Sequence, residues 1–93
     1  MSVGVAIVTL KIMPDSPETD LDKIYAEAEK IITEFGAKIG KKDFEPVAFG
    51  LKSIVIMFSM SEALGSTEEV EQKIAAIEGV SSAQVTDMRR ALG

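Results

Sequence analysis

The sequence has no cysteine and no histidine among its 93 residues. Without cysteine it can form no disulfide and has no thiol nucleophile. Without histidine it lacks the commonest transition-metal ligand and the commonest general base at neutral pH. These absences exclude most catalytic chemistries, so we expect a protein that is not an enzyme, with no catalytic residue, no cofactor and no bound metal. A chain of this length supports a single modest core, and we expect residues 1–93 to form one domain.

Positive charge is also scarce. The ten lysines and arginines are outnumbered by fifteen aspartates and glutamates, which gives a net charge of −5. Binding to the phosphates of nucleic acid needs clustered cations, so nucleic acid is not an expected direct partner. The sequence contains no apolar run near 18 residues and no basic segment followed by an apolar block. We therefore expect a cytoplasmic protein that does not contact membranes. We also expect it to be monomeric when free.

Motifs that bind small ligands are missing as well. Neither of the glycine-rich nucleotide loops, GxGxxG and GxxxxGK[ST], occurs in the sequence. Binding of single-stranded RNA by an open sheet needs exposed aromatic residues on the central strands, and only Phe58 is available there. The acidic pairs have no ligand-loop spacing and are interpreted as solvated or helix-capping charges; they are Asp20/Asp22, Asp43/Glu45 and Glu68/Glu69.

Four segments have the character of strands. Residues 3–13 and 51–60 are apolar at both alternating sets of positions, which is typical of central strands covered on both sides. The segments 37–44 and 80–88 are more polar and are predicted to be edge strands. In the segment 51–60, one face would carry Ile54, Ile56, Phe58 and Met60, and the other Leu51, Val55 and Met57.

Two segments are predicted to be helices. Apolar residues at helical spacing indicate a helix that begins at Thr19 or Asp20 and ends at Gly36. Ser66 and Glu69 match a capping box at the start of a second helix, which Gly79 would end. The resulting order β-α-β-β-α-β predicts an α+β fold of the ferredoxin-like split βαβ type. Its four-stranded antiparallel sheet would have the order 4-1-3-2, with both helices on one face and the other face half-solvated or docked on a partner.

The segment from Glu45 to Lys52, EPVAFGLK, places a large aromatic residue in a turn between two strands. Pro46 stiffens the approach, and Gly50 permits backbone angles that other residues resist. Two interpretations of Phe49 remain open: it is presented as a contact residue, or it folds back as a plug over one end of the core. Basic residues lie on both sides of the turn in the sequence, and a second basic cluster lies near the C-terminus. Each cluster is either a solvated face or a contact for an acidic partner. The residues are Lys38, Lys41, Lys42 and Lys52, then Arg89 and Arg90.

Three stretches together resemble the archaeal elongation factor 1 beta family, which corresponds to the C-terminal exchange domain of the eukaryotic subunit. They are the run from Pro46 to Lys52, the Ile77-Glu78-Gly79-Val80 helix end, and the terminal Val85-Thr86-Asp87-Met88-Arg89-Arg90. The early run from Lys11 to Pro17 also fits, so the resemblance spans nearly the whole chain. Its most specific part is Ala48-Phe49-Gly50-Leu51. The resemblance implies a guanine-nucleotide exchange factor that promotes GDP release from elongation factor 1 alpha, so that GTP rebinds during translation elongation.

The resemblance also implies partner-binding residues. In the eukaryotic relatives the aromatic residue of the equivalent turn engages the GTPase, and a lysine next to the C-terminus enters the magnesium and phosphate site. Phe49 matches the first position, with Ala48, Gly50 and Lys52 beside it. The second position departs from the pattern, because the chain ends RRALG without a lysine. The role is therefore transferred to the nearest cations, Arg89 and Arg90, at a different offset from Thr86-Asp87.

A rival hypothesis comes from a different functional class. A small ferredoxin-like regulatory or assembly module would bind a metabolite or pair its open sheet face with a second copy. Such a module would show a concentration-dependent dimer or stabilisation by a ligand, and it would have no effect on a GTPase.

Overall fold

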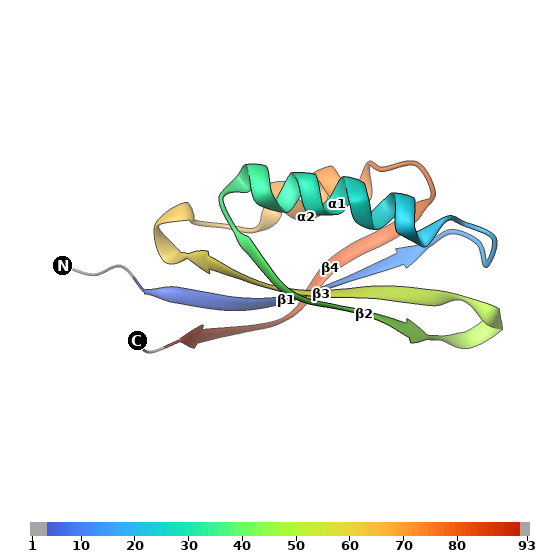
Figure 1. Ribbon diagram of the computed structural model, residues 1–93, viewed down its shortest axis with the longest axis horizontal. Helices are drawn as coiled ribbons and strands as arrows, with labels where there is room; N and C mark the ends of the chain where they lie inside the picture. Colours follow the sequence, from blue (N-terminus) through green and yellow to red (C-terminus); the bar gives the residue numbers. More distant parts are fainter. Residues whose placement is uncertain (1–3, 92–93) are drawn as a thin grey trace.

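The computed structural model describes residues 4–91. Its elements are β1 (Val5–Pro14), α1 (Leu21–Phe35), β2 (Lys38–Pro46), the short 3-10 turn η1 (Ala48–Gly50), β3 (Lys52–Ser61), a second 3-10 turn η2 (Glu62–Leu64), α2 (Glu68–Ala75) and β4 (Val80–Ala91). The strands form one antiparallel sheet in the order β2-β3-β1-β4, the predicted order read from the other edge. Both helices lie on one face of it (Figure 1). The predicted ferredoxin-like α+β fold is confirmed.

The core lies between the helices and the two central strands. Alternate residues of β1 and β3 point toward the helices, as the period of two in a strand requires. Of the two faces predicted for this strand, the one with Ile54, Ile56, Phe58 and Met60 is the inward face, since all four residues are buried. The buried apolar residues of the strands are Ala6, Val8, Leu10, Ile12, Ile54, Ile56, Phe58 and Met60; the helices add Ile24, Ala28, Ile32, Val70 and Ile74.

The other face of the sheet, called the open face below, has no helix on it within residues 4–91. It carries Val5, Ile7, Thr9 and Lys11 of β1 and Val55, Met57 and Ser59 of β3. The apolar pattern at both sets of positions does not correspond to a second covering layer within residues 4–91: Val5 is 40% exposed and Met57 is 37% exposed, so this face is half-solvated in the described chain, one of the two states predicted for it. The outward residues of these strands are apolar without being core residues.

The ends of α1 are as predicted, but those of α2 are not. Asp20 caps α1 by accepting a hydrogen bond from the Lys23 backbone N–H at 3.2 Å, and Gly36 ends it with φ 104°. The predicted capping box was wrong: Thr67 is the N-cap of α2 and makes no side-chain capping bond, and the Ser66 hydroxyl accepts from Glu68 N–H instead. Helix α2 also ends well before Gly79, which has φ 93° in the turn to β4. Short helices held by tertiary packing tolerate weak caps.

Two strands are longer than predicted. Strand β2 reaches Pro46 and β4 reaches Ala91, where we expected Phe44 and Met88. The predicted start of the first strand at residue 3 lies outside the described residues. The extension of β4 places Arg89 and Arg90 inside a strand that pairs with β1, and not in a tail after it. Neither helix in residues 4–91 combines the length and apolar character of a membrane span.

Candidate functional site

Phe49 lies at the tip of the hairpin between β2 and β3. The turn is closed by two backbone hydrogen bonds, in which Val47 N–H donates to Leu51 C=O at 2.8 Å and Leu51 N–H donates to Ala48 C=O at 3.3 Å. Within it Phe49 has φ 62° and ψ 31°, and it is the one non-glycine residue of the described chain with a positive φ. The next residue, Gly50, has φ 75°, which glycine adopts without strain.

The Phe49 side chain is 92% exposed. The interpretation of Phe49 as a plug over the core is therefore wrong, and the ring is presented to solvent. A left-handed backbone costs a residue with a side chain about 1 kcal/mol, and an exposed phenyl ring gains no burial in return. No contact within residues 4–91 offsets the strained backbone or the exposure of the ring. This is expected of a side chain that is available to bury its ring in another molecule.

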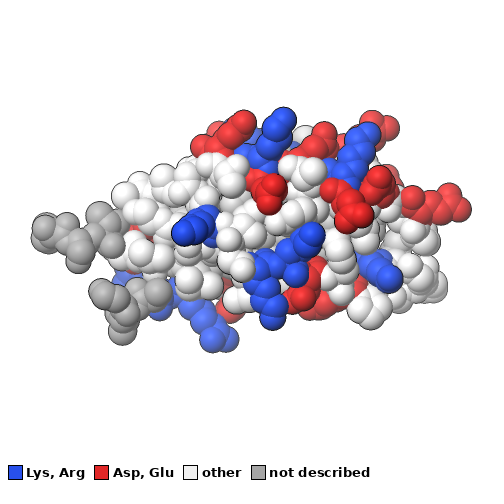
Figure 2. Space-filling view, viewed as in Figure 1, with Lys and Arg blue, Asp and Glu red and all other residues white. Residues whose placement is uncertain are grey.

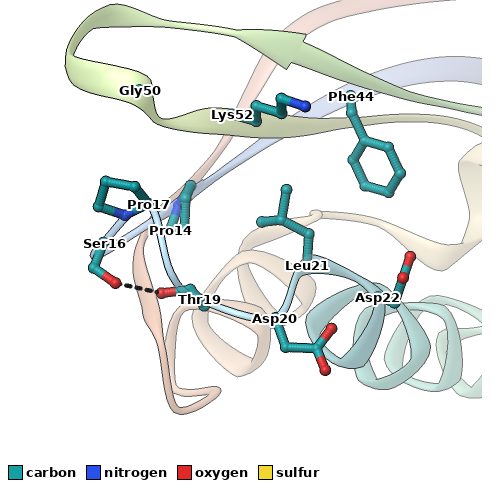
Figure 3. A pocket seen from close by; sticks show the side chains of 10 residues that line it. All are labelled: Pro14, Ser16, Pro17, Thr19, Asp20, Leu21, Asp22, Phe44, Gly50 and Lys52. Atoms are coloured by element: carbon teal, nitrogen blue, oxygen red, sulfur yellow. Dashed lines mark hydrogen bonds between the residues drawn. The ribbon is translucent and has the colours of Figure 1, made fainter.

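A hollow of about 390 Å³ lies beside the turn, between the β1–α1 loop and the β2–β3 hairpin. Leu21 and Phe44 point toward one another across it, and Lys52 lies along its β3 side (Figure 3). Its lining combines apolar side chains with three charges: Pro14, Pro17, Leu21 and Phe44, then Asp20, Asp22 and Lys52. The end of the molecule that carries Phe49 thus has both a projecting ring and an adjoining depression.

The four lysines that surround the turn in sequence do not surround it in space. Lys38 lies opposite Ser59, toward the far end of β3, and only Lys52 lies next to the turn. Lys41 is 3.5 Å from the carboxylate of Asp43. The Lys42 ammonium lies 4.2 Å from the centre of the Tyr25 ring, a cation–π contact. Three of the four lysines therefore belong to the middle and far end of the sheet.

Tyr25 remains neutral at physiological pH. Burial raises the pKa of Tyr25, and the charge of Glu29 raises it further, as does the hydrogen bond that the Tyr25 hydroxyl donates to the Glu29 carboxylate at 3.2 Å. The neutral ring offers its face to Lys42. Among residues 4–91 no three acidic side chains come together in a way that would hold a metal ion.

Arg89 and Arg90 point to opposite faces of the sheet. Arg89 is paired with Ile7 on the open face, and Arg90 is paired with Ala6, whose side chain is on the helix side. Successive residues of a strand alternate between faces, so the two guanidinium groups diverge. Arg89 Nε is 3.0 Å from Asp87 Oδ2, and Arg90 Nη2 is 2.6 Å from Glu62 Oε2.

The predicted site residues form two clusters at opposite ends of the sheet. Strand pairing places the end of β4 beside Val5 and Ser61, whereas the Phe49 turn extends beyond the other end of β3. The molecule is 48 Å long, and Figure 1 shows the β2–β3 turn at one end and the end of β4 at the other. Ala48, Phe49, Gly50 and Lys52 are brought together; Arg89 and Arg90 are not near them. A single partner that touches both clusters has to extend along the sheet.

Charge is divided unevenly between the two sides of the sheet, a feature that the sequence reading missed. In the view of Figure 2 most acidic side chains lie over the helices and toward the Phe49 end. By strand alternation the open face receives four cations and only three carboxylates; they are Lys11, Lys38, Lys41 and Arg89, then Asp43, Glu45 and Asp87. On an acidic protein, the open face is therefore the side that repels an anionic surface least.

Comparison with known proteins adds independent information. Residues 7–91 match the family described as the EF-1 guanine nucleotide exchange domain. Elongation factor 1-beta of Methanothermobacter thermautotrophicus is 42% identical over 88 residues, which cover 95% of this chain and 98% of that protein. Elongation factor 1-beta of Nanoarchaeum equitans is 38% identical over 82 residues, covering 88% of this chain and all of that protein.

Solved structures of distant proteins share the fold. The C-terminal domain of MgtC from Mycobacterium tuberculosis superimposes with a TM-score of 0.62 at 11% identity, covering 96% of this chain and 88% of that one. A homoserine dehydrogenase from Thiobacillus denitrificans gives 0.58 at 15% identity, covering 92% of this chain and 17% of the enzyme. At such identities the likeness concerns the architecture alone.

Proposed function

The chain belongs to the family of EF-1 guanine nucleotide exchange domains and has a role in translation elongation, and on this basis we propose that it releases GDP from elongation factor 1 alpha by contacting that GTPase at both ends of its sheet. The observation that carries the contact is Phe49, exposed and held in a strained turn. The proposal makes the protein a non-covalent factor, monomeric when free, that acts in the cytoplasm. Residues 48–50 and 52 form one contact, and Arg89 and Arg90 the other.

Exchange requires a difference in affinity and no covalent step. A protein that binds the GTPase more tightly when nucleotide and magnesium are absent must, by linkage, weaken the binding of nucleotide by the same factor. A thousandfold acceleration of GDP release corresponds to roughly 4 kcal/mol taken from the barrier. Two contacts separated by the length of the sheet suit this task, because a partner held at both ends has to adopt the one geometry that satisfies both.

At one end Phe49 acts as the anchor. Aromatic residues that fill a partner's pocket contribute much of the energy of protein interfaces. The η1 turn fixes the backbone from which the ring projects, so less conformational freedom is lost on association. Ala48 and Gly50 are small and let the partner's surface approach the ring, and Lys52 adds a charge at the rim of the adjoining hollow.

At the other end the arginines act on charge. Mg²⁺ binds with near-ideal octahedral oxygen geometry, and a guanidinium group brought close to it disfavours the ion electrostatically. Arginine also pairs with phosphate oxygens through parallel hydrogen bonds, which suits a site vacated by magnesium. Arg89 and Arg90 are the cations at this end of β4.

Titration calorimetry tests the proposal by comparing the affinity of this protein for the nucleotide-free and the GDP-bound GTPase. We expect this protein to bind nucleotide-free elongation factor 1 alpha at least about tenfold more tightly than the GDP- and magnesium-bound form, because exchange is that difference in affinity. Equal affinity for the two forms would rule out exchange by this mechanism. A concentration-dependent dimer with no heat on addition of the GTPase would instead support the module that pairs its open face.

A further inference from the structure

Glu62 occupies a fixed position in the η2 turn. Its backbone N–H donates to Gly4 C=O at 2.9 Å, and its C=O accepts from Gly65 N–H at 3.2 Å. The Ser61 hydroxyl caps the same turn by accepting from Ala63 N–H. These bonds tie the backbone of Glu62 to the start of β1, so the carboxylate projects from a defined point.

The Glu62 carboxylate is itself confined. It packs against Gly4 so closely that a Cβ atom on that residue would collide with it. The Glu62 side chain is 29% exposed, against 76% for its partner Arg90. Two donors of Arg90 converge on one oxygen: Nε and Nη2 lie 3.0 and 2.6 Å from Glu62 Oε2. Because the carboxylate is the better-fixed member, it determines where the guanidinium lies.

The end of β4 is held on one side by backbone pairing and has few side-chain attachments. Beyond Asp87 this edge strand pairs only with β1, and Met88, on the helix side, is 51% exposed. A hollow of about 290 Å³ lies on that side, lined by Ala6, Met60, Glu62, Gly65, Met88 and Arg90. In the described chain, the two hydrogen bonds from Arg90 to Glu62 are the only side-chain hydrogen bonds that link residues 88–90 to another element. The Glu62–Arg90 pair therefore adds a side-chain restraint to the backbone pairing with β1 at this strand end.

We propose that Glu62 is a positioning residue for exchange: by holding Arg90 on the helix side, it limits the movement of the end of β4, where strand alternation turns Arg89 toward the open face and the anionic groups of the GTPase. This inference rests on the proposed function. Arg89 is free to take such a partner, because its pairing with Asp87 joins two exposed residues of the same strand and exposed pairs contribute little. Within the contact that the end of β4 makes, Arg89 thus meets the anionic groups and Arg90 orients the strand end.

The variant Glu62→Gln tests this proposal, because positioning and electrostatic steering predict opposite changes in exchange. It keeps the side chain's size and makes an acidic protein less negative, so electrostatic steering alone would speed association with an anionic site. If Glu62 positions the strand end, the variant should instead lower the exchange rate at saturating protein by about fivefold. This is the effect expected from the loss of one ion pair. The matched control is Glu69→Gln, which removes a carboxylate paired with Lys73 at 3.0 Å on the surface of α2. We expect this control to exchange at the wild-type rate.

A double-variant cycle separates an effect of Glu62 on the position of Arg89 from an effect on the stability of the domain. In an Arg89→Gln background, Glu62→Gln should cause no further loss of exchange, whereas its effect on the melting temperature should be the same in both backgrounds. Amide hydrogen exchange at residues 88–90 should quicken in Glu62→Gln and not in Glu69→Gln.

Two results would overturn the positioning role while the exchange function stands. One is exchange by Glu62→Gln as fast as wild type or faster, and the other is an equal loss with and without Arg89. Failure of the wild-type protein to accelerate GDP release would remove both the function and this inference.

Discussion

Replacement of Phe49 by alanine is expected to lower exchange activity by about 30-fold or more, the effect of removing a residue that contributes about 2 kcal/mol to an interface. The melting temperature should change by no more than about 2 °C. The physical reason is that the ring is 92% exposed and leaves no cavity when it is removed. The measurements are GDP release from elongation factor 1 alpha and a thermal melt of each protein.

Phe49→Leu is the matched control, since it keeps an apolar side chain on the same turn and should retain part of the activity. Unaltered exchange by Phe49→Ala would reject the anchor role. A fall of many degrees in the melting temperature would show that the ring packs against the domain in solution.

Replacement of Phe58 by alanine should have the opposite pattern. Phe58 is 1% exposed, in the middle of β3 and within the core. Loss of a buried phenyl ring leaves a cavity and costs about 3–5 kcal/mol of unfolding free energy, a large part of the roughly 5–15 kcal/mol that stabilises most domains. Urea denaturation of the wild type and the variant measures the difference.

The comparison of the two phenylalanines holds the chemical change constant. The fraction of Phe58→Ala that stays folded should exchange GDP at close to the wild-type rate, because its ring touches no proposed contact. A loss of stability below about 1 kcal/mol would contradict the assignment of Phe58 to the core.

The fold could be predicted because its signals are local. Alternation in residues 51–60 and helical spacing from Leu21 to Phe35 each define a face, and Asp20 and Gly36 mark the ends of α1 through short-range hydrogen bonds. Helix α2 was placed correctly but bounded wrongly. Its eight residues are held by Val70 and Ile74 in the core, so its ends need no strong cap.

The site could be predicted only in part. The motif around Phe49 identified the turn, but whether the ring is exposed depends on a left-handed backbone within the hairpin, which sequence left undecided. The opposed directions of Arg89 and Arg90 depend on the continuation of β4 to Ala91, where alternation is weak. The distance between the two clusters follows from the antiparallel order, and tracing the strand directions in the predicted sheet would have shown it. The bond between Glu62 and Arg90 joins residues 28 positions apart and has no local signal.

Release of a fluorescent GDP analogue from the cognate elongation factor 1 alpha, with and without this protein and across a magnesium series, tests the central claim most directly. We expect clear acceleration, greatest where magnesium otherwise holds the nucleotide, because the factor acts by disfavouring the ion and its phosphates. Release at the unassisted rate with saturating protein, at every magnesium concentration, would contradict the proposed action on this GTPase.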